Sequence, residues 1–119
     1  MTEQVTIRVF EVVGSDLCVA SGDGQKVYEQ IKAVLKEGRR VELSFHNVES
    51  LTSAFLNAAV GQLYGEFTEN QIREGLKVSD MEQDDMVLLK RVVDTAKAYF
   101  KDPDRFTKTM NEELEEEDE

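Results

Sequence analysis

The feature that most constrains the fold of this sequence is a repeated change between two apolar spacings along the chain. Apolar residues at every second position predict three strands, at 5–13, 41–45 and 76–78. Apolar residues at helical spacing predict three main helices, at 25–37, 54–64 and 83–101. Strands that alternate with helices are joined by crossover connections. The pattern therefore predicts an α/β domain with a partly parallel sheet that helices cover at least in part.

Length and charge indicate one domain followed by an acidic tail. A chain of 119 residues fits a single domain of common size, and we place that domain at residues 1–101. The tail, residues 102–119, holds nine acidic and two basic residues and so carries −7 of the formal net charge of −11. It has too few apolar residues to fold alone and is expected to be disordered. Because the body is also acidic, at −4, direct binding to nucleic acid or to an anionic membrane is disfavoured.

Three features of the sequence predict a cytoplasmic protein. Cys18 is the single cysteine, which excludes an internal disulfide framework and fits a reducing compartment. The N-terminus lacks the basic start and the apolar core of a signal peptide. No apolar run approaches the roughly 18 residues that a membrane-spanning helix needs. We therefore expect no membrane association.

Polar residues and glycines predict where the helices begin and end. Residues 21–24, Ser-Gly-Asp-Gly, have the composition of a turn with a helix cap. Gly38 is expected to end the helix that follows this turn, and Ser53 is expected to cap the next helix. Two pairs have the spacing of a capping box, Thr68 with Gln71 and Asp80 with Gln83. The first pair predicts a short helix at 69–74, and the second predicts the start of the last helix.

No group of residues has the pattern of a catalytic, cofactor or metal site. His46 is the single histidine, and no nucleophile or acid accompanies it in a recognisable arrangement. Cys18 lies in an apolar stretch and is interpreted as a core residue. Residues 21–26 lack the glycine spacing of a phosphate-binding loop, and the acidic cluster at 80–85 lacks the pattern of a calcium loop. We therefore expect no catalytic residue, no metal and no cofactor.

The segment from His46 to Gly65 is the best candidate for a binding surface. A strand ends there, a loop rich in hydroxyl groups follows, and an almost entirely apolar helix begins. We expect a protein partner to bind on this loop and on the start of the helix. Ser53 and Thr52 are also candidates for phosphorylation, because backbone amides at a helix start stabilise the added charge. The predicted partner-binding residues are Glu49, Ser50, Thr52, Ser53 and Asn57.

A family resemblance is carried by the central strand, loop and helix. The segments 41–48 (VELSFHNV) and 51–64 (LTSAFLNAAVGQLY) resemble the STAS-like domain family, which is related to anti-sigma-factor antagonists. The resemblance extends over residues 5–101 and implies a mixed sheet of about four strands packed by three main helices. It also implies docking on a histidine-kinase-like ATPase or anti-sigma factor, and phosphorylation of a serine at the helix start breaks this complex in the antagonists. That position is Ala54 here, so Ser53 or Thr52 would take its role.

Three hypotheses of function follow from the sequence. The leading one is a non-catalytic regulatory module that binds another protein through residues 49–57. The second is an acidic decoy or inhibitor of a nucleic-acid-binding protein, for which the tail provides the charge. The third is an enzyme whose site the sequence does not reveal. Nothing in the sequence indicates the oligomeric state.

Overall fold

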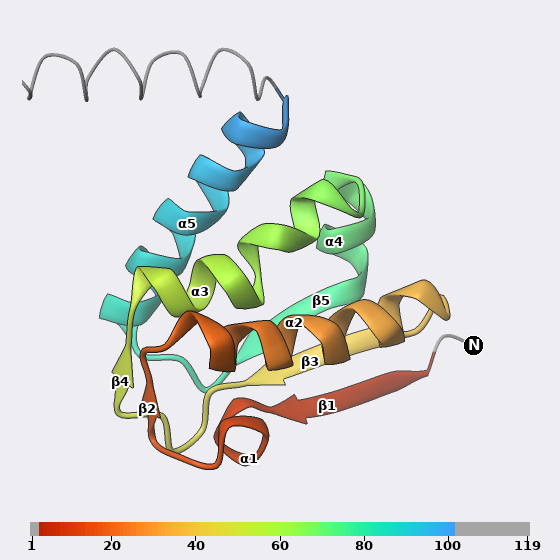
Figure 1. Ribbon diagram of the computed structural model, residues 1–119. Coiled ribbons are helices and arrows are strands. Elements are labelled where there is room, and N and C mark those ends of the chain that lie inside the picture. The colour runs from red at the N-terminus through yellow and green to blue at the C-terminus, as the bar shows by residue number, and fades with distance from the viewer. Residues whose placement is uncertain (1–2, 102–119) are drawn as a thin grey trace, which may run out of the picture.

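Parallel strands in two sheets form the framework of the molecule (Figure 1). The computed structural model describes residues 3–101, and the predicted tail at 102–119 lies outside them. The central sheet has the order β1-β3-β5 and consists of β1 (Gln4–Arg8), β3 (Arg40–Ser44) and β5 (Leu76–Ser79). The second sheet pairs β2 (Leu17–Cys18) with β4 (Ser50–Leu51).

Every strand pairing within residues 3–101 is parallel, which corrects the expected mixed sheet of about four strands to five parallel strands in two sheets. The physical reason is connectivity, because at least one helix lies between each strand and its partner along the chain. The helices are α1 (Val9–Val13), α2 (Ser21–Lys36), α3 (Ser53–Ala59), the 3-10 helix η1 (Gly61–Gly65), α4 (Glu69–Gly75) and α5 (Gln83–Lys101). The predicted α/β class is confirmed.

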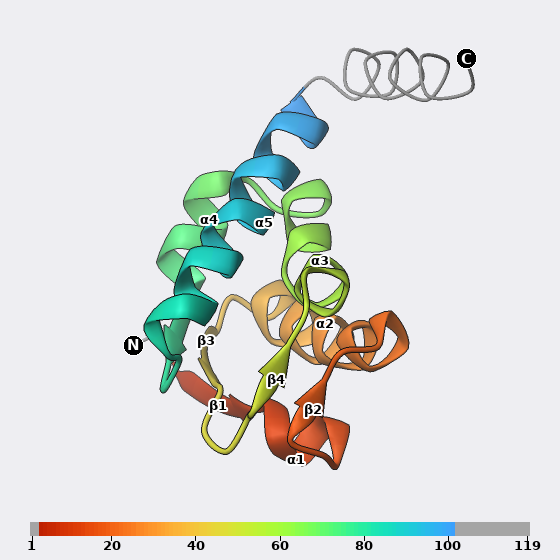
Figure 2. The same ribbon diagram turned by 90° about the vertical axis from the view of Figure 1, so that its left-hand side faces the viewer.

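The two faces of the central sheet differ in chemistry. Figures 1 and 2 show α2 and α3 on the same side of this sheet. The buried side chains that the strands present to this side include Ile7, Val41 and Leu43. On the other side Glu42 accepts hydrogen bonds from Gln4 Nε2 at 3.1 Å and from Ser79 Oγ at 2.9 Å. The strand period of two thus separates an apolar face from a polar one.

The strand predicted at 5–13 is wrong in its second half. After β1 the chain turns directly into helix α1. Val9 is fully buried, and Val12 and Val13 pack against the core, which is the helical spacing of three and four residues. Gly14 ends the helix with a φ of 77°, a conformation that glycine adopts without strain.

Helix α2 begins four residues earlier than predicted, because the glycine-rich segment 21–24 is its first turn and not a separate turn. Gly24 gives the reason. A Cβ atom at this position would collide with the backbone carbonyl of Phe55 and with the side chain of Ala58. The glycine therefore permits close contact between α2 and α3. The predicted stop at Gly38 is confirmed, with a φ of 76°.

The helix predicted at 54–64 is divided into α3 and η1. Val60 lies between the two and has a φ of −118° and a ψ of −43°, which departs from α-helical geometry. The predicted burial of this segment is correct for one side only. Its buried apolar residues are Phe55, Leu56, Ala59, Val60 and Leu63, whereas Ala54 and Asn57 are exposed.

The predicted starts of α4 and α5 have different outcomes. The capping box of Thr68 and Gln71 is confirmed, with both reciprocal hydrogen bonds formed at 2.8 and 3.1 Å. Helix α5 begins at Gln83 as predicted, but Asp80 does not cap it. Asp80 has a φ of 58°, and its carboxylate accepts a hydrogen bond from the buried Ser44 hydroxyl at 2.8 Å. Asp80 is therefore the hydrogen-bond partner of a buried hydroxyl and not a helix cap, because buried polar groups require hydrogen-bond partners.

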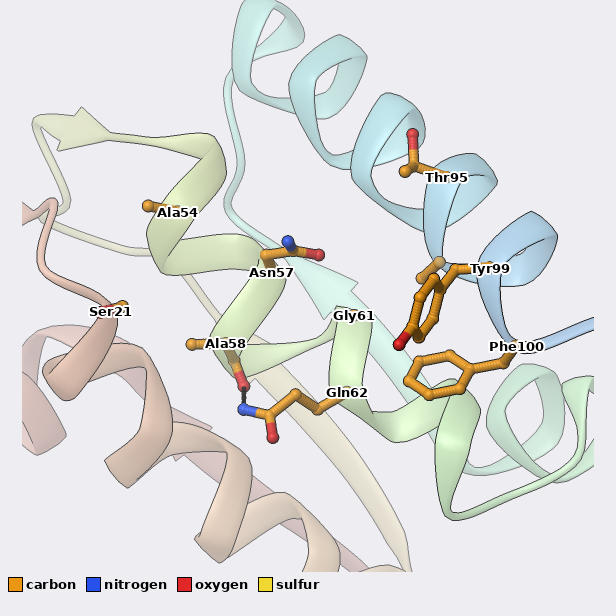
Figure 3. Close-up of a pocket in the computed structure, with 10 residues that line it drawn as sticks. Ser21, Ala54, Asn57, Ala58, Gly61, Gln62, Thr95, Tyr99 and Phe100 are labelled. Atoms are coloured by element: carbon orange, nitrogen blue, oxygen red, sulfur yellow. Dashed lines mark hydrogen bonds between the residues drawn. The ribbon is translucent and has the colours of Figure 1, made fainter. Parts of the chain in front are cut away.

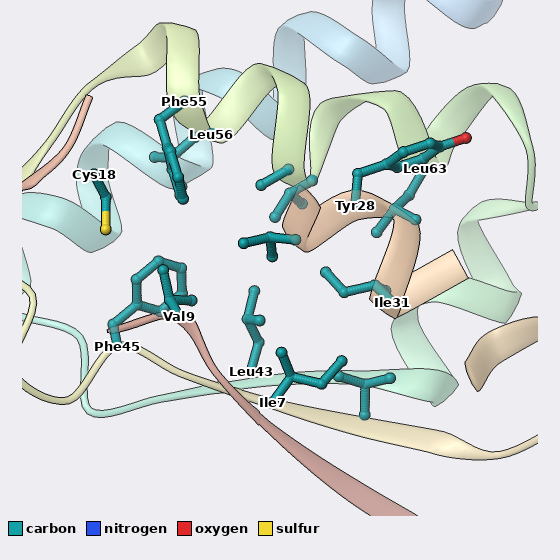
Figure 4. Close-up of a cluster of buried hydrophobic side chains, with 14 of the residues drawn as sticks. Ile7, Val9, Cys18, Tyr28, Ile31, Leu43, Phe45, Phe55, Leu56 and Leu63 are labelled. Atoms are coloured by element: carbon teal, nitrogen blue, oxygen red, sulfur yellow. The ribbon is translucent and has the colours of Figure 1, made fainter. Parts of the chain in front are cut away.

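One hydrophobic core lies between the central sheet and the helices on it (Figure 4). Leu43 from the sheet, Ile31 from α2 and Leu56 from α3 are all fully buried within it. Cys18 is also fully buried, which agrees with its interpretation as a core residue. None of the helices within residues 3–101 has the length and apolar character to cross a membrane.

Candidate functional site

The start of α3 is held in place by Thr52. The Thr52 hydroxyl accepts a hydrogen bond from the Phe55 amide at 3.2 Å and donates one to the Val19 carbonyl at 2.9 Å. Thr52 is therefore the cap of α3, and the prediction that Ser53 caps this helix is wrong. The reason is the backbone, because Thr52 is extended whereas Ser53 is already the first helical residue. Ser53 is exposed, and its hydroxyl is not needed for capping.

Glu49 and Ser50, two further predicted partner-binding residues, lie before α3 at the edge of the small sheet. Their backbone amides both donate to the Asp16 carbonyl, at 2.9 and 3.2 Å. Their side chains are exposed. This backbone anchoring fixes the segment that leads into α3 and leaves its side chains at the surface, where a partner can reach them.

A groove runs along the exposed side of α3, between that helix and α5, and we call it the α3–α5 groove. It consists of two adjoining hollows of about 520 and 410 Å³ that share Ala54, Asn57 and Thr95. Figure 3 shows Asn57 pointing from α3 toward α5. Beyond the shared residues, the lining includes Ser53, Leu88 and Arg91 at one end and Gly61, Tyr99 and Phe100 at the other.

The groove is largely apolar, and its α3 side carries small residues. Ala54 and Ala58 of α3 line it, with Gly61 of η1 beyond them, and the short side chains of the two alanines leave room for another chain to approach. The rings of Tyr99 and Phe100 form an edge-to-face pair with centroids 4.8 Å apart, and Phe100 remains 40% exposed. Among the described lining residues Arg91 alone is charged, and it forms no ion pair with another residue in 3–101.

The structure brings some of the predicted residues together and adds others. Ser53 and Asn57 lie one helical turn apart and line the same hollow. Glu49, Ser50 and Thr52 lie outside the groove, on the segment leading into it. The α5 side of the groove, with Arg91 and Thr95, was not predicted as part of a site. A signal for it in the sequence is the aromatic pair Tyr99 and Phe100 near the end of the predicted helix at 83–101.

The two residues considered for catalysis differ in exposure, since His46 is exposed and Cys18 is buried. His46 is exposed in the loop after β3, and its backbone amide donates to Ser44 Oγ at 3.3 Å. Cys18 is buried, and burial together with the nearby carboxylates of Asp23 and Asp16 raises the pKa of its thiol from 9.0 to about 11. The thiol is therefore protonated near neutral pH and is not a nucleophile there.

The acidic residues around the start of α5 do not converge on a common point. In the part of the chain that the structure describes, no three His, Cys, Asp or Glu side chains gather so that they could hold a metal ion. The Asp80 carboxylate is engaged with the Ser44 hydroxyl. Capping and helix-dipole effects are sufficient to account for acids in the first turn of α5, where Asp84 and Asp85 lie.

The sequence matches a model of a known protein family. A model described as the STAS-like domain of unknown function (DUF4325) matches residues 23–86, from the first turn of α2 to the first turn of α5. No match was found among curated proteins or among solved structures. The matched segment is more than half of the chain and includes the strand, loop and helix that carry the resemblance seen in the sequence. The chain therefore belongs to the STAS-like domain family.

Proposed function

We propose that this STAS-like domain is a non-catalytic regulatory module that binds a protein partner on the start of α3 and the segment before it. The observation that carries the proposal is the two-sided character of α3. This helix buries Phe55 and Leu56, yet it presents Ser53, Ala54 and Asn57 to solvent beside an apolar groove. An exposed apolar groove next to unengaged polar side chains is typical of a protein-interaction surface.

A histidine-kinase-like ATPase or an anti-sigma factor is the partner class that we propose. Support comes from the match to the STAS-like family, together with the resemblance of residues 41–48 and 51–64 to the group that includes anti-sigma-factor antagonists. The position of the surface also supports it, since the start of α3 follows β4 and the loop that joins the two sheets, which is the loop and helix start implied by the family resemblance. The predicted contact residues Glu49, Ser50 and Thr52 would extend this surface toward the small sheet.

Ser53 is the better of the two candidates for phosphorylation. The Thr52 hydroxyl is engaged in capping α3, whereas the Ser53 side chain is exposed and forms no hydrogen bond with another described residue. A phosphate on Ser53 would add about two negative charges at the mouth of the groove. Such a charge would oppose an apolar or acidic partner surface. We therefore propose that modification of Ser53 weakens the complex.

The test is affinity purification of the full chain from its native host with three variants. The intact protein and the control Gln30→Arg, which changes an exposed residue of α2, should recover the same ATPase-like partner. Asn57→Arg should lose it, because the new side chain occupies the groove. Ser53→Asp should lose most of it. Equal recovery with Asn57→Arg and Gln30→Arg would show that the partner binds elsewhere and would refute the proposed surface.

A further inference from the structure

We propose that the C-terminal segment of this chain, residues 104–116, docks in the α3–α5 groove and so competes there with a protein partner. The docking is independent of the function proposed above. The competition rests on that function, because it requires a partner that uses the same surface. The argument for this occupant has three steps, which concern the apolar pattern of the segment, its length and its charge.

The first step is the apolar pattern. Phe106, Met110 and Leu114 recur every four residues, so that in a helix they would form one apolar stripe among charged neighbours. A segment of this length is not stable as an isolated helix and needs a surface against which to fold. The groove provides such a surface, since it is apolar, has small residues on its α3 side, and leaves Phe100 40% exposed.

The second step is length and position. Helix α5 is described to Lys101, directly beyond the Phe100 end of the groove, and the sequence has a proline, which is unfavourable inside a helix, two residues further on at Pro103. Along α5 the groove extends from Phe100 back to Leu88, roughly 18 Å at the helical rise. As a helix, residues 104–116 span roughly 18 Å, of which the stripe from Phe106 to Leu114 takes about 12 Å. A chain that reverses after Lys101 is therefore long enough to cover the groove.

The third step is charge complementarity. On a chain that runs back along α5, Glu112 and Glu113 follow Met110 and arrive at the Leu88 end of the groove. That end contains Arg91, the charged residue of the lining, which forms no ion pair within residues 3–101. None of the described lining residues is acidic, so the groove does not repel an acidic segment.

The docking can be measured through a thiol placed in the groove of the full chain. Thr95→Cys puts an exposed thiol where the two hollows meet, and Cys18→Ala removes the native thiol from the assay. We expect iodoacetamide to modify this thiol roughly tenfold faster when Phe106→Ser and Met110→Ser are added. This ratio corresponds to a segment that occupies the groove, and so protects the thiol, about nine-tenths of the time. A matched control, Lys108→Ser with Glu117→Ser, leaves the net charge, the stripe and the acidic residues opposite Arg91 unchanged and should retain most of the protection.

The electrostatic step has its own test. Arg91→Glu should remove much of the protection, whereas Lys90→Glu, on the neighbouring α5 residue that lines a different hollow, should retain it. Equal rates in the stripe variant and its control would overturn the proposal. Protection that disappears on about hundredfold dilution would also overturn it, because the segment would then come from a second copy.

These measurements separate the docking from the proposed function, because the thiol assay uses the isolated chain without a partner. If the segment competes with a partner, Phe106→Ser with Met110→Ser should increase the amount of partner captured from the native host. Protection of the thiol together with unchanged capture would refute the competition alone. Loss of the partner from every variant would instead count against the function.

Discussion

The two sides of α3 differ in how closely another helix approaches them. On one side α2 packs in direct contact, because Gly24 brings its backbone against the Phe55 carbonyl and the Ala58 side chain. On the other side α5 leaves a groove lined by Ala54 and Asn57. Small residues occur on both sides of α3, so the difference in how closely a helix approaches arises from the neighbouring helices α2 and α5. A seven-residue helix can therefore be a core element on one side and a surface for binding on the other.

The largest expected effect comes from disturbing the closed side with Gly24→Ala. The added Cβ meets backbone at Phe55, which cannot rotate away, so α2 and α3 must separate. We expect the free energy of unfolding to fall by about 2 kcal/mol or more. Urea denaturation followed by circular dichroism measures this change.

The matched control is Gly22→Ala, in the same first turn of α2. No atom lies within 4 Å of a Cβ at this position, and alanine favours the helix more than glycine does. Gly22→Ala should be neutral or should stabilise the protein by up to about 1 kcal/mol. Equal losses of unfolding free energy in the two variants would mean that the backbone flexibility of glycine, and not the contact with α3, accounts for the role of Gly24.

A second test of the closed side uses the pH dependence of stability. Cys18 lies next to the start of α3, where its carbonyl accepts a hydrogen bond from the Thr52 amide at 3.3 Å. Its thiol has a pKa of about 11 in the native protein, raised by burial and then by Asp23 and Asp16, against 9.0 when exposed. Between these values the unfolded chain has lost the proton that the native protein retains. Stability should therefore fall as the pH rises from 9 to 11.

The expected loss is on the order of 1 kcal/mol near pH 10. Other groups titrate in this range, so the informative quantity is the difference between the intact protein and Cys18→Ala. Urea midpoints at pH 8 and pH 10 measure it, and the decrease should be smaller in the variant. An equal decrease in both proteins would show that the Cys18 thiol does not contribute.

Local patterns predicted the parts of the fold that local interactions decide. The strand at 41–45 differs from β3 by one residue, and the capping box at Thr68 is correct. The prediction of a strand at 9–13 was wrong because two patterns overlap there. The alternation of β1 continues through Val9, and Val9, Val12 and Val13 also have helical spacing. Packing against the core decides between the two patterns, and it depends on residues distant in sequence.

The candidate site could be predicted in part for the same reason. Ser53 and Asn57 belong to one short segment, so the exposed start of α3 followed from sequence order. Arg91 and Thr95 were missed because the path of α5 relative to α3 depends on tertiary packing, which its apolar stripe does not encode. The prediction that Ser53 caps α3 was wrong because either hydroxyl can cap a helix, and only the backbone geometry distinguishes Thr52 from Ser53.

A smaller effect is expected for Gly61→Ala, the counterpart of Gly24 on the open side. A Cβ there would lie 2.6 Å from Asn57 Oδ1, which is the end of an exposed side chain and can move away. We expect a change in the free energy of unfolding of less than about 1 kcal/mol in either direction. Urea denaturation of this variant and of Gly24→Ala measures the two changes. A loss as large as that of Gly24→Ala would mean that both sides of α3 are equally closed.

The smallest effect on stability is expected for Ala54→Leu, which adds volume directly to the groove. Ala54 is exposed and lines both hollows, so in a protein that also carries Phe106→Ser and Met110→Ser, which leave the groove empty, a larger side chain there meets open space, and the free energy of unfolding should change by less than about 0.5 kcal/mol. Ala59→Leu, on the buried side of the same helix, is the control and should cost about 1–3 kcal/mol through overpacking. Urea denaturation compares the two. Similar losses would mean that α5 closes over α3 in solution, and a groove that is closed could bind neither a partner nor the C-terminal segment.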